Sequence, residues 1–105
     1  MKAKKPEKAG DVLKIARACI EGGTVGFTGH ALDRLKERGI SVGDTYEVIK
    51  TGHRVLSRDR YSEEHQGWNY AIEGKTYKGK NLRIIIGFDD AGLLIITVIR
   101  LVKGV

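Results

Sequence analysis

The segments that most restrict the fold of this chain are two runs of branched apolar residues near its C-terminal end. They are NLRIIIGF at residues 81–88 and LLIITVIRLV at residues 93–102, and the turn-forming sequence DDAG lies between them. Runs of this length and composition are typical of strands, and a short polar turn joins such strands as antiparallel neighbours. The sequence therefore predicts an antiparallel hairpin in this region.

The rest of the chain changes its periodicity at Gly52. Before this glycine, apolar residues recur at helical spacing and predict helices over residues 7–21, between Thr28 and Gly39, and from Ser41 to about Lys50, with a short strand at 24–27. After it, alternating residues predict strands at 53–58 and 67–73. This order indicates an α+β fold, with N-terminal helices packed on one face of a mainly antiparallel sheet of about four strands.

The chain has 105 residues and a net charge of +6, which favours an anionic partner such as RNA, DNA or an acidic protein. Residues 1–9 are predicted to form a basic flexible tail, and residues 10–105 a single domain. The longest apolar run, Leu93–Ile99, is far shorter than the ~20 residues of a membrane-spanning helix. We therefore expect a soluble, cytoplasmic protein that does not associate with a membrane.

The segment GFTGHALDRLKERGIS, residues 26–41, carries three cationic or titratable side chains on one predicted helix. His30, Arg34 and Arg38 are four residues apart and point roughly the same way. In one interpretation this face of the helix binds phosphate. The two arginines would then bind RNA, and a neutral His30 in the first turn could accept a proton. Alternatively, the stripe is the solvated side of the helix, where Arg34 pairs with Glu37.

The C-terminal hairpin carries two arginines whose relative position depends on its register. With DDAG as a four-residue loop, the predicted cross-strand pairs are Phe88 with Leu93, Arg83 with Val98, and Asn81 with Arg100. Arg83 and Arg100 then become diagonal neighbours on one face, about 7–8 Å apart. They would repel each other unless an anion lies between them, which favours a phosphate site. The alternative is that both extend into solvent at the edges of the sheet.

The strand GWNYAIEG adds aromatic and amide side chains to this region. Trp68 and Tyr70 share one strand face, where they would either stack RNA bases or pack in the core. Asn69 points to the other face and could meet the two arginines of the hairpin. The following turn supplies further RNA-binding candidates, which are Lys75, Lys78, Lys80 and Asn81.

Other catalytic templates do not fit the sequence. The three histidines lack metal-ligand spacing, and the single Cys19 excludes a cysteine zinc site as well as a disulfide framework. Neither a phosphate-binding P-loop nor a dinucleotide-binding motif is present. We therefore expect neither a metal nor a cofactor, which leaves acid–base or electrostatic catalysis.

The motifs HALDRLKERGIS, GWNYAIEG, LRIIIGF and IITVI together resemble a family. It comprises small bacterial domains with a His-Ala-x-x-Arg-x-x-x-Arg-Gly-Ile helix motif, grouped with the RelE/MqsR-like toxins of type II toxin–antitoxin systems. The resemblance covers residues 10–102 and implies a RelE-like fold. It also implies a metal-independent mRNA endoribonuclease that acts on free or ribosome-bound RNA and is silenced by an antitoxin, often one carrying a zinc ribbon.

The resemblance implies roles for individual residues as well. The resemblance places Arg58, Arg83 and Arg100 at basic strand positions of the family, Asn69 as the polar amide beside the tryptophan, and Asn81 where the family has a tyrosine, with Tyr77 nearby. With His30 of the predicted helix added, the catalytic candidates are His30, Arg58, Tyr77, Arg83 and Arg100. The arginines would neutralise negative charge as the RNA 2′-hydroxyl attacks the adjacent phosphate. Arginine replaces lysine of the family at several positions and is a poor proton shuttle. Proton transfer is therefore assigned to His30 or Tyr77.

Two other functions are compatible with the same residues. One is a binding module without chemistry, whose basic face holds nucleic acid or an acidic protein in a salt-dependent manner. The other is a structural subunit of a small complex, without affinity for RNA. RNA cleavage in the presence of a chelator distinguishes the enzyme from both.

Overall fold

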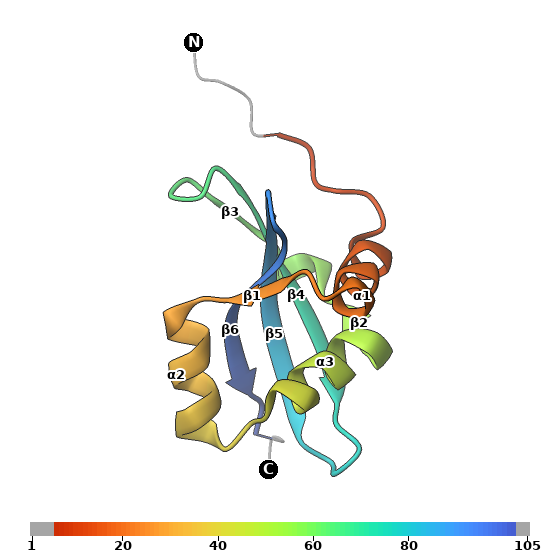
Figure 1. Ribbon diagram of the computed structural model, residues 1–105, viewed down its shortest axis with the longest axis vertical. Coiled ribbons are helices and arrows are strands. Elements are labelled where there is room, and N and C mark those ends of the chain that lie inside the picture. The colour runs from red at the N-terminus through yellow and green to blue at the C-terminus, as the bar shows by residue number, and fades with distance from the viewer. Residues whose placement is uncertain (1–5, 103–105) are drawn as a thin grey trace.

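The computed structural model describes residues 6–102 and has the predicted α+β architecture, with three helices and a mostly antiparallel sheet (Figure 1). The helices are α1 (Val12–Gly22), α2 (Gly29–Arg38) and α3 (Val42–Thr51), and a single 3₁₀ turn, η1, spans Leu56–Arg58. The strands are β1 (Val25–Phe27), β2 (His53–Arg54), β3 (Arg60–Ser62), β4 (Gly67–Lys75), β5 (Asn81–Asp89) and β6 (Gly92–Arg100). The fold class is thus confirmed, with more strands than the four expected.

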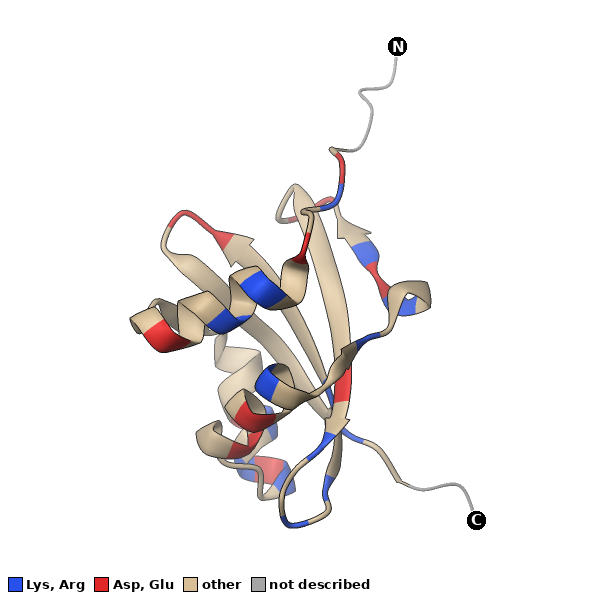
Figure 2. Cartoon of the chain, turned by 90° about the vertical axis from the view of Figure 1, so that its right-hand side faces the viewer, with Lys and Arg blue, Asp and Glu red and all other residues tan. Residues whose placement is uncertain are grey.

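The sheet has the strand order β1-β6-β5-β4-β2, and β3 pairs with the free end of β4. Only β1 runs parallel to its neighbour, β6. The three helices pack on one face of the sheet, as the edge-on view in Figure 2 shows. α2 contacts β6, α3 contacts β4 and β5, and α1 contacts α3. The opposite face of the sheet is called the open face below.

Alternation along the strands separates the core from the open face. On the helix side, Ile72, Ile84 and Ile95 are fully buried against helix residues such as Ala16 and Val48. The intervening residues of the strands project from the open face, because successive strand residues point to opposite sides. Both faces of the central strands are therefore available for different purposes, the core on one side and a polar site on the other.

The register of the β5–β6 hairpin begins as predicted and then shifts. Phe88 lies opposite Leu93, as expected, and Ile86 lies opposite Ile95. The next pair joins Ile85 to Thr97, so that β6 contains one extra residue in a β-bulge. A one-residue insertion exchanges the two faces of everything beyond it.

This bulge overturns the predicted pairing of the two hairpin arginines. Arg83 lies opposite Ile99, and Arg100 lies opposite Leu82, which is fully buried on the helix side. Arg83 and Arg100 therefore project from opposite faces of the sheet. The prediction that they flank one anion is wrong, because it assumed an uninterrupted ladder.

Two elements also have boundaries in the structure that differ from the predicted ones. The first helix begins at Val12 rather than at residue 7, and Asp11 precedes it in a left-handed conformation with φ 38°. The predicted strand over residues 53–58 is a strand only at His53–Arg54, after which the chain turns into η1. Arg58 is therefore exposed on a 3₁₀ turn and does not lie on a long strand.

A complete capping box fixes the start of α3. The Ser41 hydroxyl accepts a hydrogen bond from the Asp44 N–H, and the Asp44 carboxylate accepts one from the Ser41 N–H. The bond from the Ser41 backbone, followed by the contact with the Lys80 ammonium, holds the pKa of Asp44 below its usual value. The ionised carboxylate thus stabilises the start of the helix.

Replacing Asp44 with asparagine is expected to lower the free energy of unfolding by about 1 kcal/mol at neutral pH, because the capping carboxylate and its charge are lost. A carboxyl group with a lowered folded-state pKa stabilises the fold above its unfolded-state pKa, and this contribution disappears as the pH falls through the folded-state pKa. Urea unfolding at several pH values should therefore show the two proteins converging in acid. A constant difference down to the lowest pH would contradict this assignment.

Candidate active site

A row of three chemically active residues crosses the sheet near the end of β4. Glu73 lies opposite His53 of β2 on one side and opposite Arg83 of β5 on the other. Residues directly opposite each other in neighbouring strands project from the same face, with Cβ atoms about 4.5–5.5 Å apart. An imidazole, a carboxylate and a guanidinium are therefore neighbours on the open face.

The centre of this row is an ion pair that is mostly shielded from water. The Nε of Arg83 donates to the Glu73 carboxylate at 2.7 Å, and the two side chains are only 16% and 22% exposed. Arg83 also lies opposite Ile99, and the next row of the same face holds Ala71 and Ile85. Ionised groups among apolar neighbours are costly unless they are paired, so each of these two charges depends on the other.

A surface cavity of about 460 Å³ adjoins this row. Its lining consists of Thr51, Gly52, His53, Glu73, Gly74, Lys75, Asn81 and Leu101. Lys75 and Asn81 are cross-strand partners one step beyond the ion pair, so an ammonium and an amide reach the same space. The β4–β5 turn with its further lysines lies at this end of the molecule (Figure 2). The cavity therefore combines anion-binding groups with groups that can exchange protons.

Close backbone contact at Gly52 holds His53 in this row. A Cβ atom at Gly52 would lie 2.4 Å from the Val48 carbonyl oxygen and 2.5 Å from that of Glu73. No side chain fits there. With glycine at this position, the chain at the end of α3 packs directly against β4 and continues at once into β2. The signal in the sequence was the glycine that ends the third helix, although its role as a spacer was not evident.

We expect Gly52→Ala to destabilise the fold by about 1–3 kcal/mol, since the added methyl group collides with two rigid backbone carbonyls. Thermal unfolding measures the effect, and Gly29→Ala is the matched control because its Cβ would meet nothing within 4 Å. Equal unfolding temperatures for the two variants would show that the contact between α3 and β4 adapts freely.

Several residues expected to bind or cleave RNA lie outside this site. Tyr77 is 92% exposed in the β4–β5 turn, and His30 is exposed at the start of α2. Of the predicted catalytic set His30, Arg58, Tyr77, Arg83 and Arg100, only Arg83 belongs to the row. Lys75 and Asn81 line the cavity, and Asn69 projects from the same face further along β4.

The basic residues of α2 and of the turn make structural contacts. Arg34 pairs with Glu37, as the alternative interpretation expected, and Arg38 donates to the Val98 carbonyl at 2.9 Å. The Lys80 ammonium contacts the Gly39 carbonyl and the Asp44 carboxylate. These contacts anchor α2 and the turn, and they account for the three cations without RNA.

The two aromatic residues of β4 differ in accessibility. Tyr70 is only 4% exposed, and its ring lies 6.0 Å from that of Phe88, so it belongs to the core and cannot stack an RNA base in this structure. Trp68 is half-buried and packs edge-on against Tyr61 at 5.7 Å. Of the two predicted stacking residues, Trp68 alone is close to the surface.

His53 and Glu73 were missed as site residues, although one signal could have identified them. Alternation along GWNYAIEGK places Asn69, Ala71, Glu73 and Lys75 on one face. A five-residue turn between Lys75 and Asn81 then aligns Glu73 with Arg83. The two-residue strand that carries His53 is too short to be recognised from sequence alone.

Two searches of the described residues gave negative results. Within residues 6–102, no group of three or more His, Cys, Asp or Glu side chains is arranged to hold a metal ion. In the same part of the chain, no helix has both the length and the apolar composition to cross a bilayer.

Comparison with known proteins gives one match. Residues 27–100 correspond to a family described as a domain of unknown function, DUF4258, and they include strands β2 to β6 and the whole candidate site except Leu101 of the cavity lining. No curated protein shows significant similarity to the chain. Because the matched region makes up well over half of the sequence, this chain is a member of the DUF4258 family.

Proposed function

We propose that this domain is a metal-independent endoribonuclease that cleaves mRNA in the manner of RelE/MqsR-like toxins. The observation that carries the proposal is the row of His53, Glu73 and Arg83 beside a cavity that also holds Lys75 and Asn81. These side chains supply a base, an acid and a charge-stabilising group within one cross-strand row. RNA carries its own nucleophile, the 2′-hydroxyl, so these groups suffice for phosphodiester transfer.

The proposed reaction assigns one role to each residue. The Glu73 carboxylate accepts the proton of the 2′-hydroxyl as its oxygen attacks the adjacent phosphorus. Arg83 binds the phosphate oxygens through its Nη groups, because its Nε is bound by Glu73, and stabilises the charge that develops on them. A protonated His53 donates its proton to the 5′-oxygen as the P–O bond breaks. The products are a 2′,3′-cyclic phosphate and a 5′-hydroxyl end.

The remaining cavity residues would bind and position the substrate. Lys75 supplies a point charge for a neighbouring phosphate, and the Asn81 amide a hydrogen bond. Arg58 and Arg100 are reassigned, since neither lies in the row. As an mRNA-cleaving toxin, the domain would act in the cytoplasm and be silenced by a cognate antitoxin, such as one carrying a zinc ribbon.

Incubation of the purified protein with single-stranded RNA in excess EDTA tests the proposal. The expected result is cleavage, either of free RNA or only when ribosomes are added, together with growth arrest on expression. RNA that stays intact under both conditions, with harmless expression of both the wild type and Arg83→Ala, would refute the enzyme. Salt-sensitive binding without cleavage would instead identify a binding module.

A further inference from the structure

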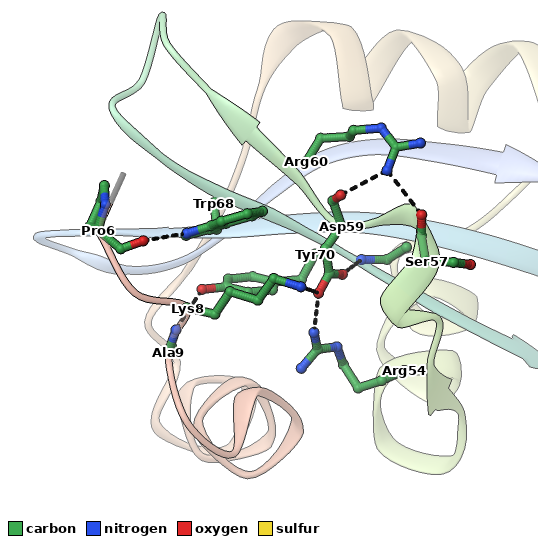
Figure 3. A network of polar contacts seen from close by, with 10 residues as sticks. Pro6, Lys8, Ala9, Arg54, Ser57, Asp59, Arg60, Trp68 and Tyr70 are labelled. Carbon is green, nitrogen blue, oxygen red and sulfur yellow. Dashed lines mark hydrogen bonds and ion pairs between the residues drawn. The ribbon is translucent and has the colours of Figure 1, made fainter. Parts of the chain in front are cut away.

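Residues 6–9, here called the strap, lie across the Trp68 end of β4, as Figure 3 shows. The Trp68 indole N–H donates to the Pro6 carbonyl at 2.7 Å, and the Ala9 N–H donates to the Tyr70 hydroxyl at 2.8 Å. Between these bonds, the Lys8 ammonium lies 4.9 Å from the centre of the Trp68 ring. Part of the segment expected to be a flexible tail is thus bound to the sheet, and residues 1–5 lie outside the described residues.

The strap also contacts a buried acid. The Asp59 side chain is fully buried, and its carboxylate contacts Lys8 at 3.0 Å. The same carboxylate is paired with Arg54 and accepts a hydrogen bond from the Ala71 N–H. If the strap detached, Asp59 would keep a cationic partner and a backbone donor, so detachment leaves no buried charge uncompensated.

The strap covers its site incompletely. Pro6, Glu7 and Lys8 are exposed along their length, and the Lys8 side chain remains 39% exposed. A cavity of about 270 Å³ remains beside it, lined by Pro6, Glu7, Ala9, Gly67, Trp68, Tyr70 and Phe88. Ion pairs and cation–π contacts of such exposed lysines are weak. The site under the strap is therefore accessible to a competing ligand.

The chemistry of that site suits single-stranded nucleic acid. The Trp68 ring is fixed edge-on by Tyr61, which leaves a face on which Lys8 now lies. Arg60, opposite Asn69 on β3, projects from the other face of this strand pair and takes no part in the site. Exposed aromatic faces stack the bases of single-stranded nucleic acid largely without regard to sequence. A base that stacks on the indole must therefore displace Lys8 from it.

We propose that Trp68 is a base-stacking site for single-stranded RNA and that the strap occupies this site until RNA displaces it. The inference rests on the proposed function, since it names a second contact of the substrate chain, near the other end of β4 and on the opposite face of that strand from Glu73. In this arrangement Lys8 covers the Trp68 ring in the free protein and leaves it when RNA binds. The strap and the RNA compete for one aromatic face.

The single tryptophan of the chain makes this competition measurable. Acrylamide quenching of Trp68 fluorescence is measured in the wild type, in Lys8→Ala and in Lys14→Ala. Lys14→Ala is the control, because it also removes one positive charge and Lys14 is exposed on α1. Relative to the wild type, we expect Lys8→Ala to raise the quenching constant at least twofold and Lys14→Ala to leave it unchanged. Equal quenching in the two variants would overturn the proposal.

Binding of a 2′-O-methyl oligonucleotide, which the proposed reaction cannot cleave, provides the second measurement. Lys8→Ala should bind at least threefold more tightly than Lys14→Ala, whereas Trp68→Ala should bind more weakly than the wild type. If the strap were only structural, Lys8→Ala and Trp68→Ala would not change the RNA affinity in opposite directions. Equal affinities of Lys8→Ala and Lys14→Ala would overturn the inference. If the affinities are equal but natural RNA is still cleaved in an Arg83-dependent manner, this inference fails and the proposed function stands. If no variant binds or cleaves RNA, the proposed function fails with it.

Discussion

Replacing Arg83 with alanine is expected to lower the rate of RNA cleavage by about 10²–10³-fold, the usual loss when one charge-stabilising donor is removed from an active site. The guanidinium is held at the centre of the open face by its 2.7 Å bond to Glu73, so a phosphate there meets a donor that is already oriented. Arg83→Lys keeps the charge but lacks the planar pair of donors, and should recover part of the rate. Single-turnover cleavage of a labelled RNA measures all three proteins.

Substitution of Glu73, the ion-pair partner of Arg83, is also expected to lower the rate of RNA cleavage. Glu73→Gln keeps the size of the side chain and removes the base, which should lower the rate by about 10²–10⁴-fold. Glu64→Gln is the control, because Glu64 is exposed in the β3–β4 turn. A Glu73→Gln enzyme with wild-type activity would show that the ion pair serves the fold alone and that the proposed base lies elsewhere.

Asp59→Ala is expected to destabilise the fold by about 3–5 kcal/mol, the largest stability effect foreseen for this chain. The Asp59 side chain is fully buried, and it is the partner of Arg54, whose side chain is only 18% exposed. The Arg54 Nε is already buried without a hydrogen-bond partner, so removing the carboxylate leaves the guanidinium with little compensation. The Ala71 N–H loses its acceptor as well.

Urea unfolding of Asp59→Ala and Lys8→Ala separates this core interaction from the strap. Both variants remove one member of the same charge cluster, but the Lys8 side chain is 39% exposed, and its loss should cost only about 0–1 kcal/mol. Similar losses in the two variants would contradict the view that Arg54 and the Ala71 N–H compensate Asp59 without Lys8. The comparison also shows whether the strap can detach without unfolding the domain.

Most of the architecture could be predicted because periodicity and capping are local properties. The change at Gly52 from helical to alternating spacing separated the helices from the strands, and the helix predicted from Ser41 does begin there, with Ser41 as its N-cap. The bulge near Ile96 could not be predicted in this way. Its sequence, LLIITVI, is uniformly apolar, and nothing in the residue types shows where a ladder loses its register.

The candidate site was predicted only in part, for a related reason. Arg83, Lys75 and Asn81 were identified by their charge or polarity next to strong strands. Glu73 and His53 enter the site only through pairings between β2, β4 and β5, which depend on turn lengths and on the two-residue strand β2. For Tyr70 the core alternative is correct, because its ring is buried against Phe88 and its hydroxyl accepts a hydrogen bond from the Ala9 N–H, a contact between distant parts of the chain.

The chemistry of the cleaved ends tests the central claim most directly. RNA cleaved by the purified protein in excess EDTA should carry 2′,3′-cyclic phosphate and 5′-hydroxyl ends, because the 2′-hydroxyl is the proposed nucleophile. The same fragments should be absent, or reduced at least 100-fold, with Glu73→Gln and Arg83→Ala. Fragments with 3′-hydroxyl and 5′-phosphate ends, or cleavage that persists in both variants, would contradict the assignment of His53, Glu73 and Arg83 as the catalytic row.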